Sequence, residues 1–121
     1  MIKIERIYDK PEEEEAFRIL VDKLWPRGLR KEELKIDLWL KEVAPSTELR
    51  KWFSHDPARW KEFCKRYKEE FAKDARENKV LIELVGMAGS GNLTLVYSAR
   101  DEEHNNAVAL KELIDSFEGG V

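Results

Sequence analysis

Short apolar runs alternate along this chain with longer segments in which apolar residues recur at helical spacing. Three runs rich in aliphatic residues predict buried strands, at residues 2–7, 17–24 and 93–98. Pro26 and Gly28 follow the second run, and both residue types favour the end of a strand. We expect a turn at residues 9–11 and a solvated acidic segment at residues 12–15.

Helices are predicted for most of the remaining chain. We expect them at residues 31–43, 47–53, 56–76 and 79–87, followed by a last helix after Asp101. The clearest is the third, whose apolar residues lie at i, i+3, i+7 and i+11: Trp60, Phe63, Tyr67 and Phe71. The residues expected to cap helix N-termini are Ser46, Asp56 and Asp101.

The alternation of strands and helices favours an α/β fold, with a small, mostly parallel sheet of three or four strands flanked by helices. The length of 121 residues is typical of a single domain, so we expect one domain over residues 1–121. In sheets of this kind, ligands bind outside the carboxyl ends of the strands. A site is therefore expected where the second and last strands end, provided that these strands are neighbours.

Composition narrows the function classes. The net charge is −3 although 39% of the residues are charged, which disfavours general nucleic-acid binding. No apolar stretch approaches the roughly 20 residues of a membrane span, and the N-terminus lacks the apolar core of a signal peptide. We therefore expect a cytoplasmic protein without membrane contact. The single cysteine, Cys64, excludes an intramolecular disulfide, and an inert thiol is favoured there.

Polar and cationic residues follow both central strands. The first group consists of Asp22, Trp25 and Arg27, and the second of Ser98, Arg100, Asp101, His104 and Asn105. Two arginines beside a helix N-terminus are typical of an anion site, but they can equally pair with nearby acids. Trp25 is either a packing residue or a wall on which a ring stacks. Asp101 is a helix cap before anything else, and His104 has a structural alternative as well.

Other chemistries receive less support. The glycines at positions 86, 89 and 91 do not follow a strand or lead into Lys-Ser/Thr, so they do not form a phosphate loop. The two histidines lie far apart, and their spacing predicts no zinc site. A triad of Ser98, His104 and Asp101 can be drawn, but the sequence of a nucleophile elbow is absent around the serine. No metal or cofactor is inferred.

Several motifs resemble those of the YeaO-like family, a bacterial and archaeal domain of unknown function. They are Val21-Asp22-Lys23-Leu24-Trp25-Pro26-Arg27-Gly28, residues 39–50, Trp52-Phe53-Ser54-His55-Asp56-Pro57 and residues 101–107. Lys23 stands where the family is expected to carry arginine. The resemblance implies a compact cytosolic α/β domain and adds His55, Pro45 and Ser46 to the candidate positions.

Two functional hypotheses follow. In the leading one, a small anionic ligand, phosphate-like or nucleotide-like, is held by Arg27 and Arg100. Asp22 and His104 then handle protons, Trp25 stacks on a ring, and Asn105 orients the substrate. The residues expected to contribute to substrate binding are Trp25, Arg27, His55, Ser98, Arg100, Asp101 and Asn105. The alternative is a protein- or nucleic-acid-binding module that uses a surface near Trp39, Trp52 and Trp60 without catalysis. A third possibility is that the polar residues only stabilise the fold.

Overall fold

The computed structural model describes residues 2–9, 16–73 and 75–119. It confirms the α/β class. The sheet has four strands in the order β1-β4-β2-β3, and every neighbouring pair is parallel. The strands are β1 (Ile2–Arg6), β4 (Leu93–Tyr97), β2 (Phe17–Leu20) and β3 (Leu38–Trp39). All four carboxyl ends therefore meet at the same edge of the sheet.

The two central strands are buried on both faces, as expected for near-continuous apolar runs in a parallel sheet. Ile19 and Leu20 of β2 and Leu95 of β4 are fully buried. Pairing continues one residue beyond β2, because the Val21 amide donates a hydrogen bond to the Val96 carbonyl at 3.0 Å. The β2 and β4 segments are thus neighbours, which was the condition for a shared site.

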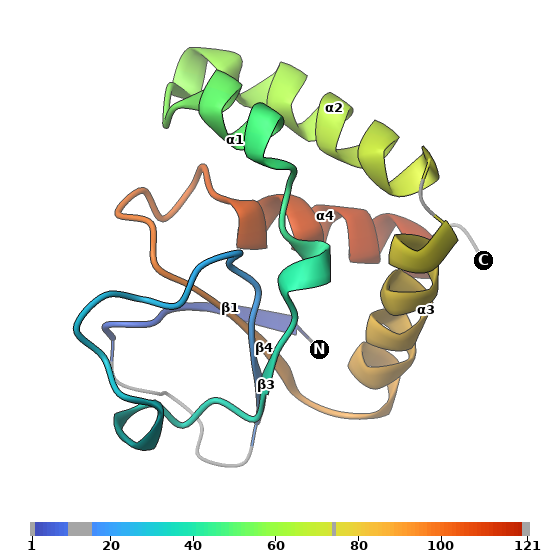
Figure 1. The fold of residues 1–121 in the computed structure, drawn as a ribbon. Coiled ribbons are helices and arrows are strands. Elements are labelled where there is room, and N and C mark those ends of the chain that lie inside the picture. The colour runs from blue at the N-terminus through green and yellow to red at the C-terminus, as the bar shows by residue number, and fades with distance from the viewer. Residues whose placement is uncertain (1, 10–15, 74, 120–121) are drawn as a thin grey trace.

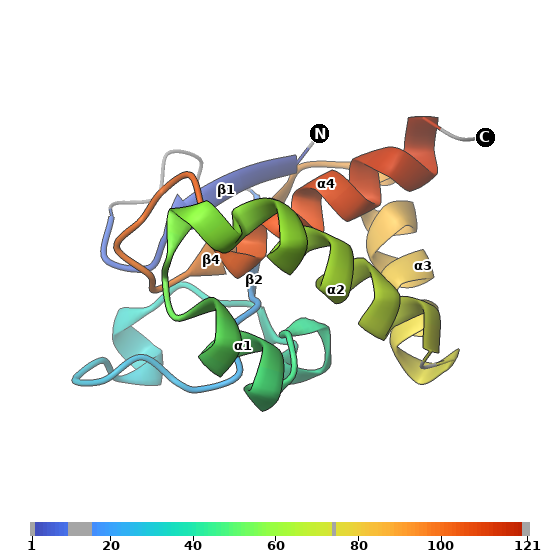
Figure 2. The ribbon, with the colours of Figure 1, turned by 90° about the horizontal axis from the view of Figure 1, so that it is seen from above.

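The helices cover one face of this sheet (Figures 1 and 2). They are α1 (Thr47–Phe53), α2 (Trp60–Lys73), α3 (Ala75–Ser90) and α4 (Asn106–Gly119). The predicted stripe of α2 is confirmed, since Phe63, Tyr67 and Phe71 are buried in the main core and Trp60 packs against it. Within the described residues, no helix combines the length and apolarity that a membrane crossing requires.

The opposite face carries a smaller core covered by irregular chain. Its buried residues are Ile7, Leu20 and Val96, and they are packed by Trp25, Leu29, Leu34, Ile36 and Trp39. The helix predicted over residues 31–43 is therefore wrong: the segment holds two short 3-10 turns, Lys31–Glu33 and Lys41–Val43, on either side of β3. Backbone hydrogen bonds to β2 explain the difference, including Asp37 N–H to the Arg18 carbonyl at 2.9 Å.

Some predicted boundaries also change. β2 ends at Leu20 rather than residue 24, and β4 ends at Tyr97 rather than residue 98. The helix expected over residues 56–76 opens with a 3-10 turn (Pro57–Arg59), and its α-helical part, α2, ends at Lys73. The next helix, α3, is longer than the predicted 79–87. The turn at 9–11, apart from Asp9, and the acidic segment at 12–15 lie outside the described residues.

Candidate functional site

Asp22 connects three elements at the carboxyl edge of the sheet. Its Oδ2 accepts hydrogen bonds from the Ser98 backbone N–H at 3.0 Å and from the Ser98 hydroxyl at 2.6 Å. Its Oδ1 accepts a third from the Asn106 side-chain amide at 3.0 Å. The same amide donates to the Val21 carbonyl at 3.0 Å. Asp22 therefore fixes the ends of β2 and β4 to the first turn of α4.

A cavity of about 410 Å³ lies beside this junction. Of the residues predicted from sequence, it brings together Asp22, Trp25, Arg27, His55, Ser98, His104 and Asn105. Arg100 and Asp101, both described, lie outside the cavity wall. The size falls within the range of about 300–1,000 Å³ typical of small-molecule sites. Most of the sequence-predicted residues thus share one concave surface, but the predicted pair of arginines does not.

The charged side chains of the described wall are mostly cationic. Lys23, Arg27 and Arg50 line the cavity, and Asp22 is the one acidic residue among the described lining residues. Lys23 Nζ donates to the Thr47 hydroxyl at 2.8 Å. The guanidinium groups of Arg27 and Arg50 have no hydrogen-bond or ion-pair partner within the described part of the chain. The cavity therefore offers two unpaired guanidinium groups, while the oxygens of its acid are engaged internally.

Aromatic rings form much of the remaining wall. Tyr8, Trp25, Phe53 and Phe63 all line the cavity. Trp25 is held in place, because its indole N–H donates to the Leu29 carbonyl at 2.8 Å and its ring packs edge-on against Trp39 at 5.2 Å. The Trp25 ring is thus both a packing group of the smaller core and part of the cavity wall.

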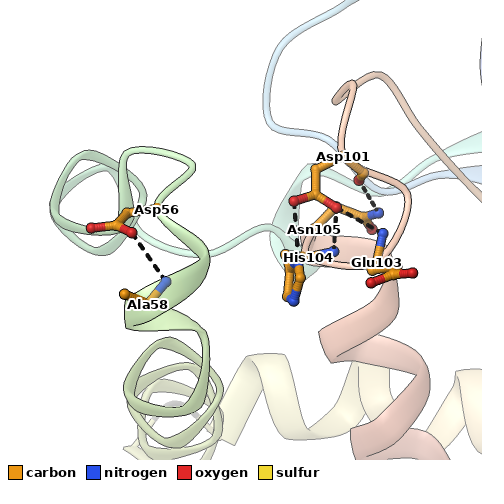
Figure 3. Close-up of polar contacts among 6 residues, drawn as sticks. All are labelled: Asp56, Ala58, Asp101, Glu103, His104 and Asn105. Atoms are coloured by element: carbon orange, nitrogen blue, oxygen red, sulfur yellow. Dashed lines mark hydrogen bonds and ion pairs between the residues drawn. The ribbon is translucent and has the colours of Figure 1, made fainter.

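His104 is oriented by Asp101. Figure 3 shows the Asp101 carboxylate directed at the His104 ring, with Oδ2 lying 2.9 Å from Nδ1. The other oxygen, Oδ1, accepts from the backbone N–H groups of Glu103 at 2.9 Å and His104 at 3.0 Å. The Glu103 N–H and then the His104 side chain lower the pKa of Asp101. On its other side, the His104 ring packs edge-on against Trp60 at 5.3 Å.

The cap of the last helix is Asn105 rather than Asp101, which corrects the prediction from sequence. Helix α4 begins at Asn106, and the Asn105 Oδ1 accepts from the Val108 N–H at 3.0 Å. The Asn105 amide donates to the Asp101 carbonyl at 2.9 Å. Asp101 instead closes the turn before the helix. Asn105 is 3% exposed, and its side-chain oxygen and nitrogen both form hydrogen bonds within the protein. It therefore supports the cavity wall and leaves no free polar group for a ligand.

His55 reaches the cavity from the turn between α1 and α2. Ser54 and His55 have φ values of 46° and 56°, and they are the non-glycine residues with positive φ among those described. This conformation costs about 1 kcal/mol or more for a residue with a side chain. The following cap is as predicted, because the Asp56 carboxylate accepts from the Ala58 N–H at 3.0 Å (Figure 3).

Other sequence-based chemistries can be placed as well. The Ser98 hydroxyl donates to Asp22, so the triad that can be drawn from the sequence is not assembled. No group of three His, Cys, Asp or Glu side chains suited to a metal ion occurs in the described ranges. Cys64 lies on α2, where burial and then the Glu112 charge raise the pKa of the thiol to about 11. The thiol is therefore a poor nucleophile near neutral pH.

The sequence analysis missed four wall residues with polar or charged side-chain groups: Tyr8, Lys23, Arg50 and Asn106. Asn106 is next to the predicted residue Asn105, and Lys23 lies inside the family motif at residues 21–28, so both could have been predicted from the sequence. Arg50 gives no such signal, because it is an exposed residue in the last turn of a short amphipathic helix. Only the tertiary placement of α1, which packs against α2, brings it to the cavity.

Fold and site together define an α/β protein with a basic, aromatic cavity at the carboxyl edge of a parallel sheet. The chain belongs to the family described as the inactive DUF488-N3 subclade, which it matches over residues 1–117. Together with the YeaO relative described next, this match confirms the YeaO-like assignment made from the motifs.

Relatives from two bacterial groups are similar along almost their whole length. "Uncharacterized protein YeaO" of Escherichia coli K12 is 41% identical over 116 residues, which cover 96% of this chain and 98% of that protein. "Uncharacterized protein Mb3100c" of Mycobacterium bovis is 35% identical over 114 residues, covering 94% of this chain and 93% of that protein. "Uncharacterized protein Rv3073c" of Mycobacterium tuberculosis shows the same identity and coverage. No solved structure matches the chain.

Proposed function

We propose that this protein binds a small anionic ligand, with a phosphate-like group held in the cavity by Arg27 and Arg50. The observation that carries the proposal is the pair of unpaired guanidinium groups in one concave wall whose single described acid is already engaged. Guanidinium groups bind phosphate and carboxylate through paired hydrogen bonds. Lys23 adds a third positive charge, and Arg50 takes the role that was predicted for Arg100.

Binding without turnover is the function we favour. The family description contains the word "inactive", which supports a domain that retains a pocket without catalysis. The geometry of Asp22 is consistent with this, because three donors already occupy its carboxylate in a structural junction. We therefore assign Asp22 to shaping the cavity rather than to proton transfer.

A second candidate function is acid–base chemistry by His104. The hydrogen bond between Asp101 and His104 Nδ1 favours it, because such a contact leaves Nε2 as the nitrogen that can exchange a proton with a ligand. The binding module built on tryptophans receives less support. Trp39, Trp52 and Trp60 are half-buried against the cores, and none is among the exposed large apolar residues of the described chain.

Thermal stability in the presence of phosphate, sulfate, nucleotides and sugar phosphates tests the proposal. A ligand at 100 times its dissociation constant adds about 2.7 kcal/mol of stability, which raises the Tm by several degrees in a domain of this size. We expect this shift in the native protein and its loss in Arg27→Ala and in Arg50→Ala.

Arg30→Ala is the matched control for these variants. Arg30 is also an exposed arginine, but it does not line the cavity. The same ligand shift should persist in this variant. Absence of a shift with every compound contradicts the proposal, and so does an equal loss in Arg30→Ala. Turnover of any compound that shifts the Tm, if abolished by His104→Gln, would favour the acid–base candidate.

A further inference from the structure

We infer that the ligand is an organic anion in which the phosphate-like group is joined to a flat apolar ring, and that this ring lies against Tyr8 and Leu24 at the rim of the cavity. The inference rests on the proposed function and specifies its ligand class. An inorganic anion requires only hydrogen-bond donors and positive charge. The rim of this cavity also presents two exposed apolar side chains, Tyr8 and Leu24.

The rim is apolar and exposed. Five large apolar side chains are exposed among the described residues: Tyr8 (49%), Phe17 (39%), Leu24 (63%), Leu38 (40%) and Ile82 (64%). Two of these, Tyr8 and Leu24, line the cavity. Exposed apolar groups that border a concave site are typical of ligand-binding surfaces, because a ligand removes them from water.

The apolar surface continues from the rim into the cavity. Pro26 and the ring of Trp25 follow Leu24 along the chain, and Phe53 and Phe63 lie deeper in the wall. Trp25 is already oriented by its hydrogen bond to Leu29. A ligand that met only Arg27 and Arg50 would leave the exposed rim of Tyr8 and Leu24 in contact with water. A flat ring covers it and gains the stacking and edge-on contacts that aromatic groups favour.

Tyr8 is fixed in a position to receive such a ring. The Arg6 guanidinium lies 4.8 Å from the centroid of the Tyr8 ring, and Arg6 Nε itself donates to the Ala99 carbonyl at 3.0 Å. A cation stacked on one face of an aromatic ring leaves the opposite face for another group. Because Arg6 is anchored to the chain after β4, little conformational freedom of Tyr8 remains to be lost on binding.

Isothermal calorimetry with three phosphates separates the contribution of the ring from that of the anion. The probes are inorganic phosphate, glycerol phosphate and phenyl phosphate. We expect phenyl phosphate to bind about 10-fold more tightly than glycerol phosphate, the gain that one aromatic contact provides. In Leu24→Ser and in Tyr8→Ser, this advantage should shrink to about 3-fold or less while binding of inorganic phosphate is retained.

Ile82→Ser is the matched control, because Ile82 is as exposed as Leu24 but lies on α3, away from the cavity wall. It should leave the phenyl phosphate advantage unchanged. Equal binding of the two organic phosphates would contradict the inferred ring contact and leave the proposed anion site intact. Loss of the phenyl phosphate advantage in Ile82→Ser would do the same. Binding of phenyl phosphate that Arg27→Ala and Arg50→Ala leave unchanged overturns the proposed function instead. No binding of any phosphate overturns both.

Discussion

Two cavities of nearly equal size differ in what their charged groups do. The first, at the carboxyl edge of the sheet, has a volume of about 410 Å³, and the second, between α1 and α2, about 400 Å³. In the second, the Glu70 carboxylate accepts hydrogen bonds from the Ser46 N–H at 2.9 Å and from the Ser46 hydroxyl. Arg66 pairs with Glu62 at 3.1 Å and lies 4.1 Å above the Trp52 ring. Glu70 and Arg66 are therefore paired inside the protein, and the other charged residues of this wall, Glu48, Glu69 and Lys73, are exposed and of mixed sign.

The first cavity keeps its arginines unpaired and pairs its acid. Arg27 and Arg50 have no partner in the described chain, whereas Asp22 has three donors. The left-handed residue His55 also borders this cavity and not the second one. Unpaired charge of a single sign, together with backbone strain at the same concave wall, distinguishes a site prepared for a ligand from a surface that only joins two helices. Cavity volume alone does not distinguish the two, because it is nearly the same in both.

The largest effect is expected for Asp22→Ala at the first cavity. Loss of the carboxylate leaves the Ser98 N–H and hydroxyl without their acceptor and removes one of the two acceptors of the Asn106 amide, so we expect the free energy of unfolding to fall by about 3 kcal/mol. Chemical denaturation measures this. Asp115→Ala, which removes an exposed ion pair with Lys111 on α4, should change stability by about 0.5 kcal/mol or less. Equal losses of unfolding free energy in the two variants would contradict the role of Asp22 in joining β2, β4 and α4.

The next effect tests whether the second cavity is only structural. Glu70→Ala removes the acceptor of the two Ser46 hydrogen bonds, and we expect a loss of about 1–2 kcal/mol in denaturant unfolding. The anion-induced Tm shift should stay the same, because the first cavity is untouched. Glu69→Ala, an exposed residue of the same wall, is the control and should have little effect on either measurement. A ligand shift that changes in Glu70→Ala would show that the second cavity takes part in binding.

A smaller effect, of opposite sign, is expected at the strained turn. Ser54→Gly relieves a residue with a φ of 46°, so we expect a gain of about 0.5–1 kcal/mol in thermal unfolding. Ser116→Gly, in the last turn of α4, should give no such gain, because Ser116 is not in the left-handed region and glycine has a low helix propensity. Destabilisation by Ser54→Gly would show that the serine side chain matters more than the backbone conformation.

The smallest effect is the pH dependence at Asp101. Its pKa is lowered in the folded protein, so the carboxylate stabilises the fold above its unfolded pKa of about 3.9, and this contribution is lost as pH falls through the folded pKa. The Tm difference between the native protein and Asp101→Asn should therefore be larger near pH 6 than near pH 3, as scanning calorimetry can measure. A difference that is the same at both values would contradict this contribution.

Sequence reasoning succeeded where a single element carries the signal. The stripe of Phe63, Tyr67 and Phe71 predicts both the helix and its buried face, because side chains one turn apart share a face whatever the rest of the fold does. It failed over residues 31–43, where Leu34, Leu38 and Val43 lie at near-helical spacing but form no helix. Pairing of Leu38–Trp39 with β2, a contact far away in the sequence, decided that segment.

The amino-acid sequence by itself determined the α/β class, the family, the buried central strands and most of the polar residues that meet at the sheet edge. The tertiary structure decided the strand order that makes β2 and β4 neighbours, the pairing of Asp22 with Ser98 and Asn106, and the exchange of Arg100 for Arg50 in the cavity wall. The physical reason is the range of the interactions. Periodicity is set by neighbours along the chain, whereas the partner of a charged side chain depends on which distant elements pack beside it.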